Sequence, residues 1–203
     1  MSETAEFMPG EPVIRQQSAS PSVAERILAC LAREETMMKE DGDDYRGVNP
    51  TAENIDAGLT TLIEKSMGAV CKITSPLVGC LEFAERPGRR GLYFMDTPFF
   101  SPVSITGMVC AGSQLTLFAM GVVNPSGCPL APTVKICGNP RTMRTWGDEI
   151  DVDVSGLIDA TQTLAQAAGQ IADAVARCAR GEQTRTEARG EGQLIVPRTL
   201  AAL

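Results

Sequence analysis

Three short apolar segments constrain the fold of this chain more than any other feature. Each has the length and composition of a buried β-strand, and each is followed directly by glycine, proline or polar residues that end it. The segments are residues 92–95, 115–120 and 133–137. Ser101 and Pro102 open a helical segment between the first two, and strand–helix–strand units of this kind build parallel sheets. The pattern predicts an α/β fold.

Ligands of open parallel sheets bind beyond the carboxyl ends of the strands. We therefore expect function at residues 96–97, 124–128 and 138–139, which follow the three strands. The remaining periodicity predicts helices at residues 21–41, 58–71, 102–111, 140–146 and 155–180, and strands at residues 77–83 and 194–197.

Residues 1–20 contain proline, glycine, serine and glutamine with few apolar residues, which predicts a flexible leader. Residues 21–203 are then expected to form a single three-layer, Rossmann-like domain, with a mostly parallel sheet flanked by helices. The Ala-rich segment 155–180 suits either core packing or a homo-oligomer interface.

Composition excludes several classes of function. The net charge of −7 argues against a surface for nucleic acid or anionic lipid. The chain contains no histidine, which excludes Ser-His and Cys-His catalysis by this chain alone and removes the commonest metal ligand. Seven isolated cysteines, no secretory signal and no stretch that would span a bilayer indicate a cytoplasmic protein with reduced thiols.

Asp96 and Thr97 follow the strand 92–95 and precede Pro98. The carboxylate of Asp96 is suited to holding a metal ion, orienting a substrate hydroxyl or acting as a base. The alternative is a carboxylate that caps the following helix or its own turn.

Glu64 and Lys65 lie in the first turn of a helix that opens with Thr60 and Thr61. Free backbone N–H groups and threonine hydroxyls at a helix start favour an anion such as a sugar-acid carboxylate, and Lys65 adds charge or a proton. The alternative is an exposed Glu–Lys pair on a solvated helix face.

Asn124 lies in a glycine-bounded loop, residues 121–128, whose form suits close approach to a ligand. Asn139 either contacts a ligand or only begins a helix. The acidic residues at 148, 149, 151 and 153 alternate with apolar ones, which indicates an extended segment with carboxylates on one side. Such a face suits either a hard metal ion or plain solvation.

Several motifs, taken in order, resemble the C-terminal domain of the altronate/galactarate dehydratases, a domain shared with sulfolactate sulfo-lyase large subunits. They are Asn-Pro-Thr at 49–51, Gly-Leu-Thr-Thr-Leu-Ile-Glu-Lys-Ser-Met-Gly at 58–68, Gly-Leu-Tyr-Phe-Met-Asp-Thr-Pro at 91–98, Asp-Glu-Ile-Asp-Val at 148–152, and the ending 181–197. The resemblance covers roughly residues 22–203.

The resemblance implies a lyase that removes water from a sugar acid such as altronate or galactarate, or sulfite from sulfolactate. The family abstracts the proton α to a carboxylate, and divalent iron or manganese (Fe2+ or Mn2+) is the expected metal. Its ligands in this chain are unknown. Carried over by position, Asp96, Lys65 and Glu64 are the catalytic candidates, with the general base unassigned among them, and Asn49, Thr60, Thr61 and Thr97 line the substrate site. Asn124 and Asn139 join the substrate-binding candidates because of their position after the strands, not through the resemblance.

Two departures from the family shape the expected function. Family members carry an amino-terminal and a middle domain before this one, which predicts a second chain that supplies the missing domains. The loop after the second strand is usually Thr-Thr-Gly-Arg-Gly but here reads Ala-Met-Gly-Val-Val at 119–123, which loses a bidentate carboxylate partner. The sequence therefore predicts a small-molecule hydro-lyase completed by a separate chain. The alternatives are a sulfo-lyase subunit or a non-catalytic scaffold.

Overall fold

A computed structural model describes residues 3–40, 51–56, 58–98 and 101–197. The chain divides into two compact units, which we call the first unit (residues 1–112 and 195–203) and the second unit (residues 113–194). Both combine helices with parallel strands, which confirms the α/β class.

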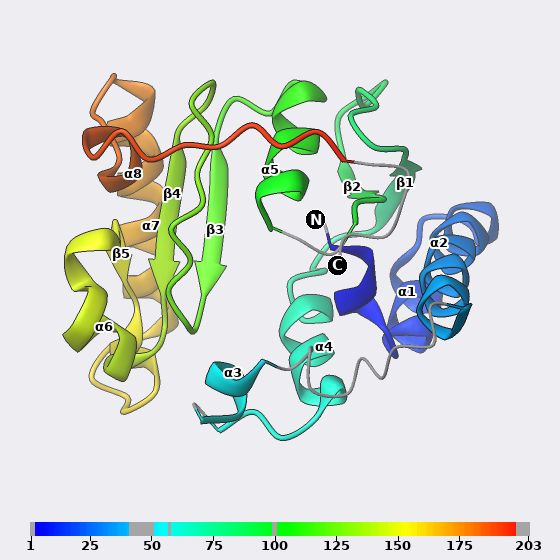
Figure 1. The fold of residues 1–203 in the computed structure, drawn as a ribbon, viewed down its shortest axis with the longest axis horizontal. Coiled ribbons are helices and arrows are strands. Elements are labelled where there is room, and N and C mark those ends of the chain that lie inside the picture. Colours follow the sequence, from blue (N-terminus) through cyan, green and yellow to red (C-terminus); the bar gives the residue numbers. More distant parts are fainter. Residues whose placement is uncertain (1–2, 41–50, 57, 99–100, 198–203) are drawn as a thin grey trace. The chain divides into compact units, whose positions relative to one another are not determined.

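The first unit places most of its helices before its strands (Figure 1). The helices are η1 (Thr4–Phe7), α1 (Glu11–Gln17), α2 (Pro21–Glu40), α3 (Ala52–Asp56), α4 (Leu62–Val70) and α5 (Ser101–Cys110), and the strands are β1 (Leu77–Leu81) and β2 (Leu92–Met95). The two strands pair in parallel, and the register places Cys80 opposite Phe94. Residue 96 therefore leaves the sheet at the carboxyl end of β2.

The core of the first unit joins the amino-terminal helices to this sheet. Phe7 of η1 packs edge-on against Phe94 of β2, with ring centroids 5.2 Å apart. Ile14, Ile27 and Leu77 complete the fully buried centre of the same cluster. Burial of side chains of this size contributes about 1.5–3 kcal/mol each, so η1 and α1 are held firmly against the strands.

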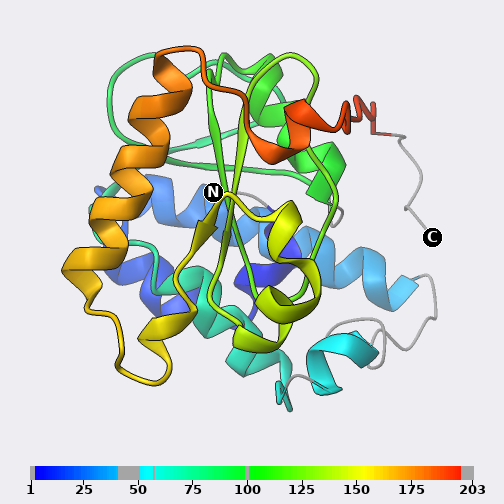
Figure 2. The ribbon, with the colours of Figure 1, turned by 90° about the vertical axis from the view of Figure 1, so that its left-hand side faces the viewer.

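The second unit builds a three-stranded parallel sheet. Its elements are β3 (Thr116–Met120), β4 (Thr133–Cys137), α6 (Pro140–Trp146), η2 (Gly147–Glu149), β5 (Val152–Asp153), η3 (Ser155–Leu157), α7 (Leu164–Ala179) and α8 (Arg185–Ala188). The strand order is β3-β4-β5, and all five residues of β4 are buried. Figure 2 shows α7 along one face of this sheet, with α6 and α8 on the other.

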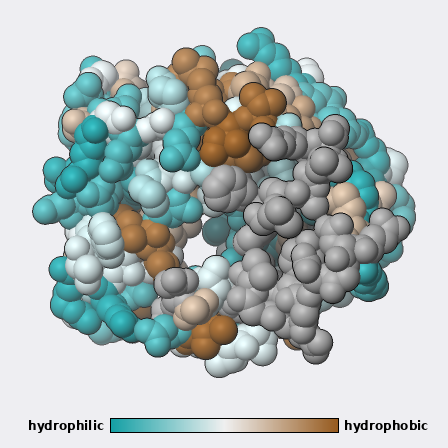
Figure 3. Space-filling model, in the orientation of Figure 1, coloured by the Kyte–Doolittle hydropathy of each residue, from teal (hydrophilic) through white to brown (hydrophobic). Residues whose placement is uncertain are grey.

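Helix α7 covers the sheet with its alanine-rich face. Ala167 and Ala174 are buried against Val134 and Ile136 of β4, and Ile171 packs against the same cluster. Core packing therefore accounts for this face, and a homo-oligomer stays a prediction. The surface around α6 and α8 is mostly hydrophilic (Figure 3).

Several sequence predictions differ from the structure. The leader expected to be flexible instead contains η1 and α1, because Phe7 and Ile14 are apolar enough to anchor both in the core. The strands form two sheets in two units, where a single sheet was expected. The long helix begins at Leu164, since Thr163 caps it through a reciprocal contact with Gln166, and residues 194–197 are not in a strand.

Among the described residues, no helix combines the length and the apolar character that crossing a membrane requires. All seven cysteines are free thiols. Cys128 is buried in its loop, whereas Cys71 and Cys110 are exposed.

Candidate functional site

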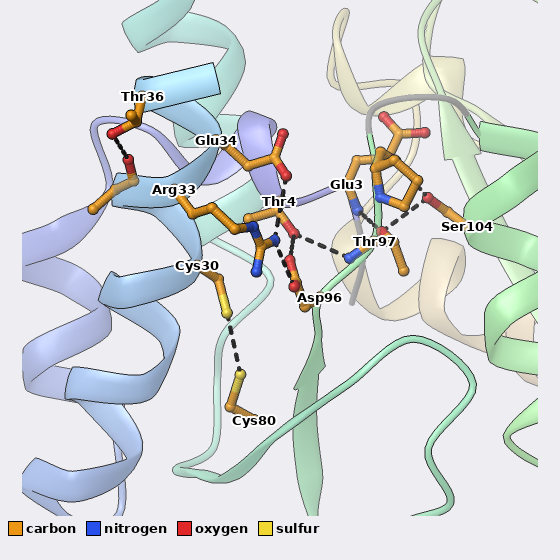
Figure 4. Close-up of polar contacts among 12 residues, drawn as sticks. Glu3, Thr4, Cys30, Arg33, Glu34, Thr36, Cys80, Asp96, Thr97 and Ser104 are labelled. Carbon is orange, nitrogen blue, oxygen red and sulfur yellow. Dashed lines mark hydrogen bonds and ion pairs between the residues drawn. The ribbon is translucent and has the colours of Figure 1, made fainter. Parts of the chain in front are cut away.

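Asp96 is the centre of a buried polar cluster at the carboxyl end of β2. Its Oδ2 accepts a hydrogen bond from Nη2 of Arg33 at 2.6 Å, and its Oδ1 accepts one from Oγ1 of Thr4 at 2.8 Å. Arg33 comes from α2 and Thr4 from η1, so three separate segments meet at this carboxylate (Figure 4). Only 8% of Asp96 is exposed. The hydrogen bonds from Arg33 and Thr4 offset the free-energy cost of burying this carboxylate.

Thr97 extends the cluster toward α5 and the amino terminus. It is 1% exposed, and its Oγ1 accepts hydrogen bonds from the backbone N–H of Glu3 at 2.6 Å and from Oγ of Ser104 at 2.9 Å. Its backbone N–H donates to Oγ1 of Thr4, and its carbonyl accepts from the backbone N–H of Thr4. Residues 3–4 are therefore fixed to the strand end by side-chain and backbone bonds together.

The cluster carries perturbed acidic groups. Burial, followed by the charge of Glu6, raises the pKa of Glu3 to about 7, although Ser101 and Lys65 act in the opposite direction. Burial also raises the pKa of Glu34, against the lowering effect of Arg33. Burial alone would lower the pKa of Arg33, but the hydrogen bond and charge of Asp96 raise it instead. Perturbed groups that cluster in this way are typical of functional sites.

The predicted catalytic residue Lys65 reaches the cluster through Glu6. Its Nζ lies 3.0 Å from Oε1 of Glu6, and only 18% of its side chain is exposed. Because the charges of Glu6 and Lys65 both act on Glu3, Lys65 belongs to the same electrostatic group as residues 3–6. The structure thus places Asp96, Thr97 and Lys65 within one connected network of the first unit.

Glu64, Thr60 and Thr61 form the cap of α4. The Glu64 carboxylate accepts hydrogen bonds from the backbone N–H groups of Thr60 and Thr61 and from the Thr60 hydroxyl, and these contacts lower its pKa. The backbone N–H of Glu64 donates in return to Oγ1 of Thr61. The backbone N–H groups and threonine hydroxyls that we expected to bind an anion therefore make the bonds of a reciprocal capping box.

We expect Glu64→Gln to retain both helix and turnover, because glutamine also satisfies a capping box, whereas Glu64→Ala lowers stability by exposing the cap donors. Thermal unfolding and the rate of the assembled enzyme check this. A Glu64→Gln variant that folds normally but has lost turnover would instead assign Glu64 a chemical role.

The two predicted asparagines of the second unit make local contacts. Oδ1 of Asn124 accepts from the backbone N–H of Ser126, and Oδ1 of Asn139 accepts from the backbone N–H of Arg141, which makes Asn139 the cap of α6. The predicted contact Asn49 lies outside the described residues.

Lys135 is a buried charge that the sequence pattern did not single out. Its side chain is 0% exposed, and Nζ donates to the carbonyl of Pro125 at 3.1 Å and lies 3.8 Å from Oε2 of Glu191. Burial lowers the pKa of Lys135 against the opposing charges of Glu191, Glu149 and Asp151. This lysine anchors the loop that carries Asn124 to β4.

The second unit also contains cavities, of about 290 and 690 Å³. The larger is lined by Asp153, Asp159 and Asp173 without a basic residue, which does not suit an anionic hydroxy acid. The smaller is lined by two basic residues, Arg177 and Arg185, together with the acidic Asp151 and Glu182, and the Arg177 guanidinium is paired with Glu182. We therefore place the candidate site at the polar cluster of the first unit.

The residues of the described chain do not fit the divalent metal that the resemblance implies. Among them, no group of three or more His, Cys, Asp or Glu side chains is arranged to hold a metal ion. The acidic residues at 148–153 are largely engaged: Asp151 accepts from the backbone N–H groups of Lys135 and Arg185, and Glu149 pairs with Arg189. Fe2+ or Mn2+ stays a prediction, and we derive no step through a metal.

The sequence of this chain has counterparts among known proteins. The chain matches the family described as D-galactarate/altronate dehydratase, C-terminal, over residues 1–201, and it belongs to that family.

Its curated relatives are lyases by name. It is 35% identical over 199 residues to the (2R)-sulfolactate sulfo-lyase subunit beta of Chromohalobacter salexigens. The aligned region covers 97% of this chain and 51% of that relative. It is 25% identical to the galactarate dehydratase (L-threo-forming) of Escherichia coli, over 80% of this chain and 31% of the relative. It is 32% identical to the altronate dehydratase of Escherichia coli, over 68% of this chain and 28% of that relative. The chain thus spans about half the length of these relatives or less.

Proposed function

We propose that this chain forms part of a lyase that eliminates a leaving group from a hydroxy acid, and that a second chain completes the catalytic unit. The observation that carries the proposal is the buried cluster around Asp96, in a family named for dehydratases. The similarity to a sulfo-lyase subunit beta supports the second chain, because that relative is by name one subunit of an enzyme.

The reaction makes three demands that the cluster can meet. A base must remove the proton α to the substrate carboxylate, a proton donor must assist the leaving group, and a cation must bind the carboxylate. The side chain of Arg33 remains about half exposed although its guanidinium pairs with Asp96, so we propose that it contacts a substrate anion as well. Asp96 orients this guanidinium, and Lys65 supplies a second cation nearby.

Two substrate classes follow from the relatives. A sugar acid such as altronate or galactarate carries several hydroxyls, each of which needs a polar partner in a closed site. The broad match to a sulfolactate sulfo-lyase subunit favours the second class, sulfolactate, with sulfite as the leaving group. We retain the sugar-acid hydro-lyase as the other candidate.

The experiment begins with the tagged chain, recovered from its native cells with whatever binds it. The recovered assembly is analysed for iron and manganese and assayed with altronate, galactarate and (2R)-sulfolactate. We expect turnover of one of these by the assembly and little by the chain alone.

Turnover of a hydroxy acid by the purified chain without a partner would contradict the two-chain proposal. An assembly that turns over none of the three substrates, with or without added Fe2+ or Mn2+, would favour the non-catalytic scaffold instead.

A further inference from the structure

We propose that Glu3 is the group that exchanges the proton with the substrate in this elimination. This inference rests on the proposed lyase function and assigns one role within it. The step balances within the site. The Glu3 carboxylate accepts the proton from the carbon α to the substrate carboxylate, the C–H electron pair forms the double bond, and the bond to the β-hydroxyl or sulfonate breaks. Glu3 then passes its proton to the departing hydroxide or sulfite.

The first argument is that the neighbouring carboxylates already have fixed partners. Both oxygens of Asp96 are bonded, to Arg33 and Thr4. Glu34 accepts from Arg33, and Glu6 pairs with Lys65. The hydrogen bonds of the Glu3 side chain go to Ser101 and Glu6, and neither is a cation. In the described part of the cluster, Glu3 is therefore the carboxyl that no basic side chain holds by a direct bond.

The second argument is position. The backbone of Glu3 is fixed to Thr97 by two bonds, Glu3 N–H to Oγ1 of Thr97 and the adjacent Thr4 N–H to the Thr97 carbonyl. Figure 4 shows the Glu3 side chain directed away from the Arg33–Asp96 pair. Glu3 also has a φ of 66°, a left-handed conformation that a non-glycine residue adopts only when its surroundings impose it. Strained backbone of this kind is concentrated at functional sites.

The third argument is chemical. The charged groups that act on Glu3 are Glu6 of its own helix, which opposes ionisation, and Lys65 of α4, which favours it. Ser101 of α5 adds a hydrogen bond, and burial outweighs both favourable contacts, so the pKa of Glu3 rises to about 7. A group that is half protonated near neutral pH can both accept and return a proton, which is the requirement for general acid–base catalysis.

The test compares Glu3→Gln, Glu3→Asp and the exposed control Glu25→Gln. Carboxyl NMR of the chain labelled with 13C-glutamate should show one side chain that titrates near pH 7 and disappears in Glu3→Gln. In the assembled enzyme, Glu3→Gln should lower kcat by about 100-fold or more and remove the acidic limb of the pH–rate profile near pH 7. Glu3→Asp should keep part of the activity with a displaced limb, and Glu25→Gln should match the wild type.

Wild-type kcat and an unchanged acidic limb in Glu3→Gln would overturn the role of Glu3 while leaving the lyase function intact. A Glu3 carboxyl that titrates at the ordinary value of 4.5 would also overturn it. Absence of turnover by the wild-type assembly on every hydroxy acid would overturn the lyase function, and the role of Glu3 with it. Substrate α-proton exchange with D2O, present in the wild type and lost in Glu3→Gln, would support the step directly.

Discussion

Asp96→Asn is expected to lower turnover of the assembled enzyme by about 100-fold and the free energy of unfolding by about 2 kcal/mol. Asparagine keeps the shape of the side chain but removes the charge that holds Arg33, and its amide group presents a donor where the Thr4 hydroxyl now donates. Removal of one partner from a fully buried ion pair costs about 3–5 kcal/mol. The Arg33 side chain is 49% exposed, so solvent recovers part of that cost.

A double-mutant cycle separates the pair from its surroundings. We expect Asp96→Asn combined with Arg33→Gln to be less destabilising than the sum of the two single variants, because each single change leaves a charge or donor without its partner. Urea denaturation of the chain measures the stability terms. Thr4→Val serves as a comparison that removes the second bond to Asp96 and the acceptor of the Thr97 N–H but leaves the ion pair intact. Strict additivity of the two changes would contradict a coupled Asp96–Arg33 pair.

Local sequence patterns predicted the elements of this fold well. Strands β2 and β4 have the boundaries expected from their apolar runs, and helix α6 has the bounds Pro140–Trp146 expected for a short helix after the third strand. The helix was predicted to start at residue 155 because apolar residues recur at helical spacing from there. The structure starts α7 after Thr163, where Thr163 and Gln166 form a capping box that the prediction did not consider. The leader was misjudged for a different reason. A few apolar residues, Phe7 and Ile14 among them, are enough to fix a short segment when a complementary core already exists elsewhere in the chain.

In the candidate site, too, features that depend on neighbouring residues could be predicted, whereas contacts between residues far apart in the sequence could not. Asp96 and Thr97 could be predicted because position after a strand is a local property. Thr4 and Arg33 contact Asp96 across 92 and 63 positions of the sequence, and no periodicity in one chain reports such a pairing. Glu64 had two interpretations in the sequence, part of an anion site or part of an exposed Glu–Lys pair on a solvated helix face. The structure shows the contacts of the capping box, while a chemical role for Glu64 stays open to test.

The last prediction concerns the stability of the first unit as a function of pH. The folded pKa of Glu3, about 7, lies above its ordinary value of 4.5, so the folded state binds the Glu3 proton more tightly than the unfolded chain does. Stability from this group is fully present below about pH 4.5 and is lost as the pH rises through 7. At 1.36 kcal/mol per pH unit, the loss amounts to roughly 3 kcal/mol by pH 8.

Glu3→Gln should abolish this loss, because glutamine resembles the protonated carboxyl at every pH. Urea denaturation at pH 4.5 and pH 8 should therefore show the variant close to the wild type at the lower pH and roughly 3 kcal/mol more stable at the higher pH. The exposed control Glu25→Gln should show no such widening. A difference between variant and wild type that is the same at both pH values would mean that Glu3 ionises as freely as an exposed carboxyl. If Glu3→Gln is more stable at pH 8 but has lost turnover, the burial of Glu3 serves proton exchange and lowers the stability of the folded state.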